Sequence, residues 1–318
     1  MKRQLLGVAA FMLALSAHAQ DNPLWMRYCA ISPDGTSIAF TYKGDIYTVP
    51  VNGGKAAQIT TNAAHDTHPV WSPDGKQIAF ASDRMGSMDI FVVDREGGIP
   101  KRLTTHSGNE TPVAFKDADH ILFLTNVMPS AEDAQFPSGQ FQQVYEVSTT
   151  GDRPVMFSSM PMEDISINKT GNALLYHDKK GYEDPWRKHH TSSITRDIWL
   201  CSLDGKRSYR KLTSFNGEDR TPVWASDGKS FYYLSEEKGS FNVFKRALDG
   251  TSSTQLTHHT KHPVRFLTAA DNGTLCYGYD GEIYTMKEGT EPRKVQISIL
   301  TDKNDKDLIR QIRRNGAT

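Results

Sequence analysis

The chain contains little cysteine and has no excess charge of either sign. Its 318 residues include three cysteines, and 37 lysines and arginines balance 37 aspartates and glutamates. Such a balance gives no field to attract nucleic acid or an anionic membrane, and we expect neither as a partner. Cys29, Cys201 and Cys276 fit no zinc or redox spacing. Cys29 and Cys276 lie in the apolar runs RYCAI and TLCYGY, which predicts two buried free thiols.

Motifs of the common catalytic classes are also missing. The sequence holds no G-x-S-x-G, H-E-x-x-H, P-loop or G-x-G-x-x-G pattern. We therefore predict no catalytic residue and no cofactor. The groups His65 with His68, and His258-His259 with His262, lack the carboxylates or further histidines at fixed spacing that a metal site needs. We predict no metal site and interpret these histidines as loop or channel-rim residues.

The first 19 residues have the composition of a secretory signal peptide. Lys2 and Arg3 precede an apolar run from Leu5 to Leu15, and small residues then flank His18. The run is too short to span a bilayer, and the order of charge, apolar run and Ala-x-Ala predicts cleavage after Ala19. A buried N-terminal helix is the alternative interpretation. We expect an exported protein, periplasmic or extracellular, without a membrane span.

One pattern of strands and turns recurs along the rest of the chain. Residues 28–60 and 68–104 both contain an apolar strand, the turn Ser-Pro-Asp-Gly, an alternating strand with Ile-Ala-Phe, and a strand that begins with Asp-Ile. A Gly-Gly turn and a short strand ending in Ile-Thr or Leu-Thr follow. Ser-Pro-Asp-Gly favours a tight turn, because proline presets φ, aspartate bonds the local backbone and glycine accepts a positive φ.

The same frame returns four more times and predicts the fold. Four strands per unit at about 40 to 45 residues are typical of propeller blades, and two of the units here are longer. Residues 20–300 are therefore predicted to form an all-β, six-bladed β-propeller of four-stranded blades. A β-solenoid would need shorter coils, and sandwiches would not repeat in this way. How the ring closes is left open. The six last strands are predicted around Ile59, Leu103, Val155, Leu212, Leu256 and Val295.

Two blades carry insertions, and a polar tail follows the last blade. The third blade gains residues 126–143 and the fourth gains residues 178–197. Loops of this length in a compact repeat are usually functional or disordered. Residues 301–318 are predicted to form a linker or tail toward a missing C-terminal region.

Polar residues precede each predicted inner strand, where the blades of a propeller converge on one mouth of the axial channel. We interpret them either as a solvated rim with capping hydrogen bonds or as a filter that contacts peptides or a partner protein. The predicted rim residues are His65, His68, Asn109, Glu110, Glu163, Asp164, Asp219, Arg220 and His262.

The fourth-blade insertion is rich in basic and aromatic residues. Arginine binds carboxylates in bidentate fashion, and tryptophan offers an anchoring face. The insertion could hold a peptide carboxylate or dock an acidic surface; alternatively, it is a solvated basic loop whose tryptophan packs on the blade. The predicted peptide- or partner-binding residues are Trp186, Arg187, Lys188, His189, His190 and Arg196.

Three segments resemble the N-terminal six-bladed propeller of the tricorn protease family. They are residues 176–200, YHDKKGYEDPWRKHHTSSITRDIWL, the preceding MPMEDISI, and residues 215–224, FNGEDRTPVW. The resemblance implies a longer protein with a second, seven-bladed propeller, a PDZ domain and a serine peptidase core of the tail-specific type. It also implies large oligomers that trim oligopeptides, with this propeller as a channel or gate.

The resemblance supplies no catalytic residue to this chain. The sequence ends at Thr318, about where the second propeller would begin, so we expect a non-catalytic domain whose partners are oligopeptides and the remaining domains or the oligomer. Whether the chain by itself is an enzyme stays open.

Two other hypotheses are carried forward. The Ser-Pro-Asp-Gly repeats also resemble the periplasmic propeller of the Tol system, which predicts a stand-alone module that binds partner proteins. A propeller enzyme acting on carbohydrate would instead need two converging carboxylates, for which Glu110, Glu163, Asp164 and Asp219 are the candidates.

Overall fold

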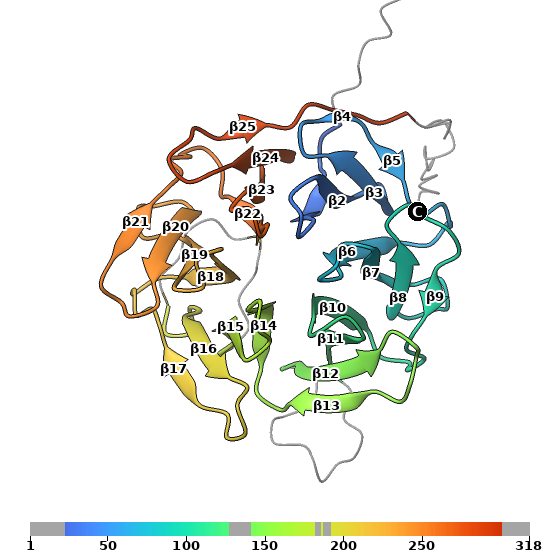
Figure 1. Ribbon diagram of the computed structural model, residues 1–318, viewed down its shortest axis with the longest axis horizontal. Helices are drawn as coiled ribbons and strands as arrows, with labels where there is room; N and C mark the ends of the chain where they lie inside the picture. The colour runs from blue at the N-terminus through green and yellow to red at the C-terminus, as the bar shows by residue number, and fades with distance from the viewer. Residues whose placement is uncertain (1–22, 127–140, 182–185, 187–191, 301–318) are drawn as a thin grey trace, which may run out of the picture.

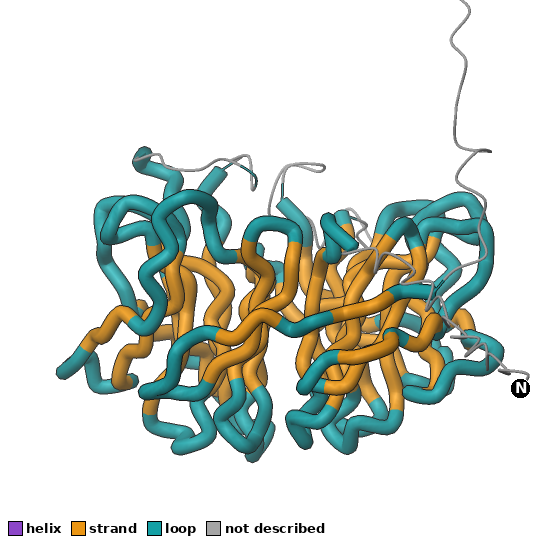
Figure 2. The backbone as a smooth tube through the Cα atoms, turned by 90° about the horizontal axis from the view of Figure 1, so that it is seen from above, coloured by secondary structure: helices purple, strands orange, loops and turns teal. Residues whose placement is uncertain are grey.

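Six four-stranded sheets surround a central axis. The computed structural model describes residues 23–126, 141–181, 186 and 192–300, and every regular element in these ranges is a strand. Figure 1 shows the sheets as six blades around a common axis, and Figure 2 shows loops on both faces of the disc. The prediction of a six-bladed propeller is confirmed. The described residues include no helix long and apolar enough to cross a membrane.

Each blade is an antiparallel meander whose strands follow chain order from the axis outward. Blade 1 comprises β1 (Arg27–Ile31), β2 (Ser37–Tyr42), β3 (Asp45–Pro50) and β5 (Ala57–Gln58). Blade 2 comprises β6 (Asp66–Trp71), β7 (Gln77–Ser82), β8 (Asp89–Asp94) and β9 (Lys101–Arg102). Blade 3 comprises β10 (Glu110–Phe115), β11 (His120–Thr125), β12 (Gln143–Ser148) and β13 (Val155–Ser158).

The second half of the ring repeats this order. Blade 4 comprises β14 (Met162–Ile167), β15 (Ala173–Asp178), β16 (Ile198–Ser202) and β17 (Tyr209–Lys211). Blade 5 comprises β18 (Asp219–Trp224), β19 (Ser230–Ser235), β20 (Asn242–Ala247) and β21 (Ser253–Gln255). Blade 6 comprises β22 (Arg265–Ala269), β23 (Leu275–Tyr279), β24 (Glu282–Met286) and β25 (Arg293–Lys294).

The Ser-Pro-Asp-Gly motif forms the turn between the first two strands of a blade. In blade 1, Gly35 has φ 72° and its N–H donates to the Ser32 carbonyl at 2.8 Å. The Asp34 carboxylate accepts the Thr36 N–H at 3.0 Å, and the Ser32 hydroxyl accepts the Ser37 N–H at 3.0 Å. Hydrogen bonds from Ser32 and Thr36 lower the pKa of Asp34 to about 2. The turn chemistry deduced from the sequence is confirmed.

The Ile-Thr and Leu-Thr pairs lie just after the outermost strand rather than at its centre. In blade 1, β5 ends at Gln58, and Ile59 is only 6% exposed. The Ile59 N–H donates to the Ile46 carbonyl at 2.8 Å, and the Thr60 hydroxyl accepts the Ile46 N–H at 2.9 Å. The same two bonds form in blades 2, 4 and 5, so in these four blades the pair anchors the end of the short outer strand to the third strand. In blade 3, by contrast, Val155 is the first residue of β13.

The two ends of the propeller meet without sharing a blade. Strand β26 (Ile297–Ser298) pairs in parallel with β4 (Gly54–Lys55), and the Met26 N–H donates to the Gly281 carbonyl at 3.1 Å. A hydrophobic cluster with residues from blades 1 and 6 fills the junction, and it contains Cys29 and Cys276. Both thiols are buried and free, as predicted. We call this junction the seam.

Candidate functional site

Every inner strand has a β-bulge at the same level. In β6, for example, Thr67 pairs with Ala81 and Val70 with Ala79, so His68 and Pro69 together oppose Phe80. Four other inner strands shift register at the equivalent place, and β10 shifts one residue later, between Pro112 and Ala114. Bulges re-aim side chains and are common next to functional sites. The six residues at the position of His68 form what we call the bulge ring: Tyr28, His68, Pro112, Asp164, Thr221 and Phe266.

Five members of the bulge ring adopt a left-handed backbone conformation. Their φ values are 53° for Tyr28, 55° for His68, 49° for Asp164, 52° for Thr221 and 58° for Phe266. This conformation costs about 1–2 kcal/mol for a residue with a Cβ, and such strain clusters at ligand clamps and active sites. In blade 3 the equivalent residue is a proline, whose ring holds φ negative. The concentration of strain at one level singles out the channel as the candidate site.

The bulge ring narrows the channel with two side-chain groups. The Tyr28 ring lies 3.6 Å from the His68 ring and 4.9 Å from the Phe266 ring, measured between centroids. The Thr221 hydroxyl donates to the Asp164 carboxylate at 2.6 Å. Burial lowers the pKa of His68 to about 4, although Asp164 opposes the shift, so His68 is neutral at physiological pH. The constriction is aromatic and uncharged on one side and polar on the other.

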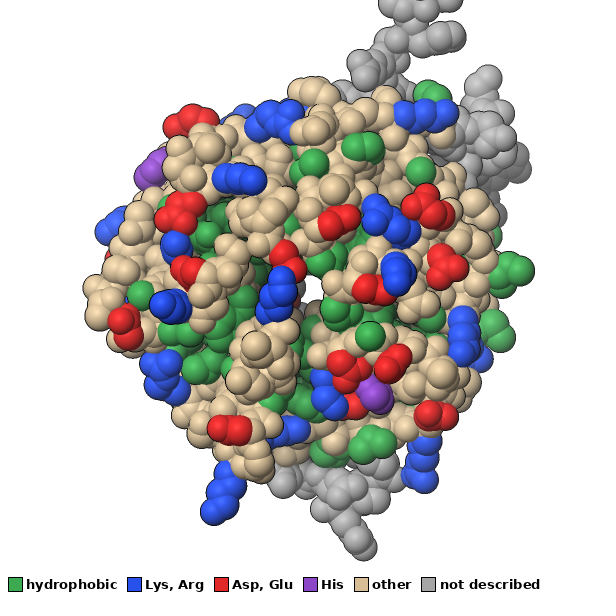
Figure 3. All heavy atoms as spheres, in the orientation of Figure 1, with side chains coloured by type: hydrophobic (Ala, Val, Ile, Leu, Met, Phe, Trp, Pro, Cys, Tyr) green, Lys and Arg blue, Asp and Glu red, His purple; other side chains and the backbone are tan. Residues whose placement is uncertain are grey.

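A cavity of about 990 Å³ extends from the bulge ring toward the Ser-Pro-Asp-Gly turns. All six members of the bulge ring contribute to its lining. Ala30, Val70, Ala114 and Val223 make much of its middle apolar. At the turn end, which we call the turn mouth, the Lys169 ammonium and Asp271 carboxylate pair at 2.9 Å between blades 4 and 6. Figure 3 shows a narrow opening at the axis, bordered by charged side chains.

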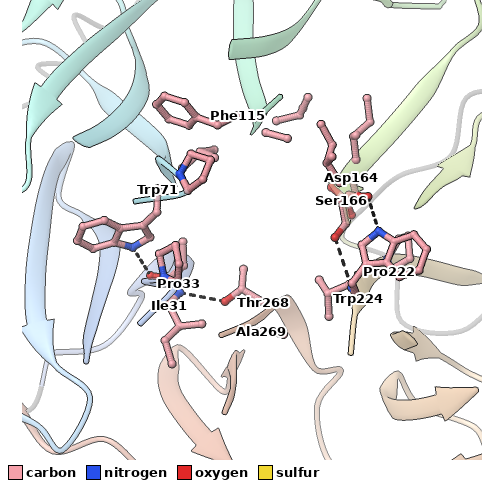
Figure 4. Close-up of a pocket in the computed structure, with 18 of the residues that line it drawn as sticks. Ile31, Pro33, Trp71, Phe115, Asp164, Ser166, Pro222, Trp224, Thr268 and Ala269 are labelled. Carbon is pink, nitrogen blue, oxygen red and sulfur yellow. Dashed lines mark hydrogen bonds between the residues drawn. The ribbon is translucent and has the colours of Figure 1, made fainter. Parts of the chain in front are cut away.

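Hydrogen bonds between neighbouring blades fix the cavity wall. The indole N–H groups of Trp71 and Trp224 donate at 2.9 Å to the carbonyls of Ala30 and Ser166 in the preceding blades (Figure 4). Across the seam, the Ile31 N–H donates to the Thr268 hydroxyl at 3.1 Å. Because these bonds join the inner strands of neighbouring blades directly, they fix the distances between those strands and therefore the width of the cavity.

The opposite end of the channel is charged, and we call it the basic mouth. The residues just before the bulge ring include Arg27, Arg220 and Arg265 on blades 1, 5 and 6, and Glu163 on blade 4. None of these arginines contributes to the cavity lining, whereas Glu163 does. Burial lowers the pKa of Arg220 to about 10, while Glu218 opposes the shift; the guanidinium remains charged at neutral pH.

Glu163 is the acidic centre of the basic mouth. The Thr221 N–H donates to His177 Nδ1 at 3.3 Å, which leaves Nε2 protonated and facing Glu163 Oε2 at 3.2 Å. Lys179 Nζ lies 2.7 Å from Glu163 Oε1. Burial by itself would raise the pKa of Glu163, but His177 and Lys179 outweigh burial and hold it well below its usual range. Glu163 is therefore an ionised structural partner rather than a proton donor.

The structure brings together only part of the predicted rim. His68, Glu163 and Asp164 line the cavity. Arg220 does not: it is 7% exposed, and its guanidinium lies 3.5 Å from the Glu218 carboxylate and over the Phe241 ring. His65 and Asn109 are exposed and do not line the cavity. His262 lies 3.3 Å from the Asp280 carboxylate.

For Glu110 and Asp219 the interpretation as a solvated rim is wrong, because each is 2% exposed. Glu110 accepts a hydrogen bond from the Thr104 hydroxyl, and Asp219 from Ser235 and Thr213. Burial raises the pKa of Glu110 to about 7 and that of Asp219 to about 6. Neither lines the cavity, so they do not form the carboxylate pair that carbohydrate chemistry would need.

The predicted binding residues of the fourth-blade insertion separate into three groups. Residues Arg187, Lys188, His189 and His190 lie outside the described residues. Arg196 is 5% exposed, and its guanidinium contacts Glu218 at 3.0 Å and Glu163 at 3.5 Å, so it is a buried ion-pair residue. Trp186 is 44% exposed and stands at the basic mouth. No group of three or more potential metal ligands occurs among the described residues.

Sequence reasoning missed Tyr28, Thr221 and Phe266, and it missed Arg27 and Arg265, although it did name Arg220. Aligning the six repeats on their first turn would have placed these residues at equivalent positions. Their left-handed conformation had no local signal, since aromatic and β-branched residues disfavour a positive φ.

Comparison with known proteins gives one consistent result. The model of the tricorn protease N-terminal β-propeller domain matches residues 23–292. Tricorn protease homolog 1 of Streptomyces coelicolor is 25% identical over 279 residues, which cover 87% of this chain and 25% of that protein. This chain thus spans about a quarter of that relative's length.

Two solved structures show the same fold. The crystal structure of the tricorn protease aligns with a TM-score of 0.73 at 20% identity, covering 89% of this chain and 27% of that chain. The crystal structure of TolB from Acinetobacter baumannii aligns with a TM-score of 0.59 at 15% identity. The alignment covers 82% of this chain and 60% of the TolB chain.

Proposed function

From the premise that the chain belongs to the family of tricorn protease N-terminal β-propeller domains, we propose that it is the non-catalytic channel of a larger serine peptidase. In this proposal oligopeptides pass along the axial cavity, and hydrolysis takes place in other domains. The observation that supports it most directly is a cavity lined by all six inner strands and narrowed by the strained bulge ring.

The size and lining of the cavity suit a short extended peptide. Its volume of about 990 Å³ lies at the upper end of the range for ligand pockets. Small apolar side chains such as Ala30 and Ala114 offer contact without strong polar anchoring. Weak contacts favour fast dissociation, which a passage requires. The narrow bulge ring would exclude folded proteins, because only an extended chain has a small enough cross-section.

Binding of peptides to occluded variants tests the channel. Val70 and Val223 are partly buried, line the cavity, and lie on blades 2 and 5, on opposite sides of the axis. We expect Val70→Trp and Val223→Trp to weaken binding of a fluorescein-labelled oligopeptide pool at least roughly tenfold, since a bulky ring would fill the passage. The matched controls, Val70→Ile and Val223→Ile, add one methylene each and should bind like the parent chain.

Two results would contradict the channel. Equal binding by the tryptophan variants, with unchanged melting temperatures, would show that peptides bind elsewhere. Cleavage of the pool by this chain alone would show that it contains its own catalytic site. The Tol-type alternative is supported by the Ser-Pro-Asp-Gly repeats and the shared fold.

Export is part of the same proposal. The order of Lys2, Arg3, the apolar run and Ala17-His18-Ala19 supports processing by a signal peptidase. Expression of the full sequence in a bacterium, followed by fractionation and N-terminal sequencing, should give a periplasmic chain that begins at Gln20. An unprocessed chain in the cytoplasmic fraction would refute export.

A further inference from the structure

Trp186 stands at the basic mouth between two guanidinium groups. The Cζ atoms of Arg27 and Arg265 each lie 4.8 Å from its ring centroid. The Phe266 ring meets it edge-on, with centroids 6.2 Å apart and ring planes at 70°. Trp186 belongs to the insertion between β15 and β16 of blade 4, whereas these partners begin β1 and β22 on blades 1 and 6. Figure 1 shows blade 4 on the opposite side of the axis from blade 1.

The backbone of Trp186 is held as well as its ring. Arg265 Nη2 donates to the Trp186 carbonyl at 3.1 Å. The same arginine thus contacts the π face of the side chain and the main chain of one residue. This combination would recognise an aromatic residue within a peptide rather than an isolated ring, because the arginine contacts both the side-chain ring and the backbone carbonyl.

The partners of Trp186 are fixed by the strands that carry them. Arg27 and Arg265 immediately precede Tyr28 and Phe266, the bulge residues whose backbones are left-handed. The Tyr28 and Phe266 rings contact each other with centroids 4.9 Å apart. The bulges therefore orient both guanidinium groups before any ligand arrives, and preorganisation of this kind favours binding. We call Arg27, Arg265 and Phe266 the aromatic clamp.

We propose that the aromatic clamp is an acceptor site for an aromatic residue of a peptide at the basic mouth, and that Trp186 is its internal competitor. The inference rests on the proposed passage of peptides and adds the class of peptide that is preferred. The evidence that the ligand is an aromatic residue is Trp186, because its ring already occupies the aromatic clamp in the way that we propose for a peptide. Because 44% of its surface is exposed, a competing aromatic residue can replace it without unfolding the blades.

Competition predicts the effect of removing Trp186. A tethered group acts at a high effective concentration and lowers the apparent affinity of a free ligand. We expect Trp186→Ala to bind a labelled peptide Gly-Gly-Trp-Gly-Gly roughly tenfold more tightly than the parent chain does. The matched control, Trp25→Ala, removes an exposed indole that lies near Arg27 at 5.8 Å but not between two arginines, and it should leave the affinity unchanged.

A second probe separates cation–π recognition from simple hydrophobic binding. The peptide in which cyclohexylalanine replaces tryptophan keeps the bulk but lacks a π face. In the Trp186→Ala background it should bind several-fold more weakly than the tryptophan peptide. Adding Arg265→Gln or Arg27→Gln should abolish this preference while leaving the melting temperature within a few degrees, because both side chains lie at the mouth of the channel.

The outcomes distinguish this inference from the function on which it rests. Equal affinity of the two peptides, or no gain on Trp186→Ala, would overturn the aromatic clamp. If peptides without aromatic residues still bind and lose binding in Val70→Trp, the channel stands and the clamp alone fails. If neither class of peptide binds any variant, both proposals fail.

Discussion

The seam allows a quantitative test of how the ring is closed. Gly53 has φ 89°, and a Cβ added there would lie 2.4 Å from the Gln296 carbonyl oxygen. No real Cβ tolerates that approach, so Gly53→Ala must move β26 away from β4. Two backbone hydrogen bonds would be lost, Gly54 N–H to Gln296 at 2.8 Å and Ala56 N–H to Ser298 at 2.9 Å.

The magnitude follows from two contributions. Alanine at a positive φ costs about 1–2 kcal/mol, and two lost hydrogen bonds at 0.5–1.5 kcal/mol each add about 1–3 kcal/mol. Gly97 in blade 2 is the matched control, because it has φ 90° and its added Cβ would meet its nearest atom, the Ile59 carbonyl oxygen, only at 3.6 Å. Gly97→Ala should therefore show the φ cost alone.

Urea unfolding of the two variants measures the difference. We expect Gly53→Ala to lower the free energy of unfolding by about 1–3 kcal/mol more than Gly97→Ala does. Equal losses would refute the reasoning and would mean that the pairing of β26 with β4 does not contribute to closing the ring.

Three further predictions concern titration and thiols. Since the pKa of Glu163 is depressed in the folded state, the extra stability of the parent chain over Glu163→Gln should shrink as pH falls below about 4.3; a constant difference would contradict it. The pKa of Asp219 is raised to about 6, so relative to Asp219→Asn the parent should lose stability as pH rises from about 4 to 6; a gain would be the wrong sign. Burial raises the pKa of Cys276, and Ellman's reagent should label no cysteine until urea is added; rapid labelling of the native chain would contradict its burial.

The sequence was sufficient for the repeating part of the fold. Ser-Pro-Asp-Gly and strand alternation are local signals, and they form the turns and strands that they predict. The Ile-Thr and Leu-Thr pairs follow the outer strands instead of lying at their centres, although Ile59 is buried and still donates to the Ile46 carbonyl.

The site was less accessible to sequence reasoning, because it depends on contacts between distant blades. Tyr28 and Phe266 take a backbone conformation that their side chains disfavour, and the surrounding bulges impose it. Trp186 was singled out by composition, but its partners Arg27 and Arg265 are far from it in the chain. The burial of Glu110 depends on Thr104 in the neighbouring blade, which no local pattern reports.

Pro112 has a consequence for any molecule that crosses the propeller. Five sectors of the bulge ring share one backbone conformation and the sixth cannot adopt it, so no rotation of the disc maps the constriction onto itself. A ligand on the axis therefore meets six chemically different directions, with tilted aromatic rings in contact in some and the Thr221–Asp164 hydrogen bond in another. For the proposed passage of peptides, we expect such an axis to select a rotational orientation as well as a width. The two faces of an extended chain, whose side chains alternate, would then be distinguished from each other at the bulge ring.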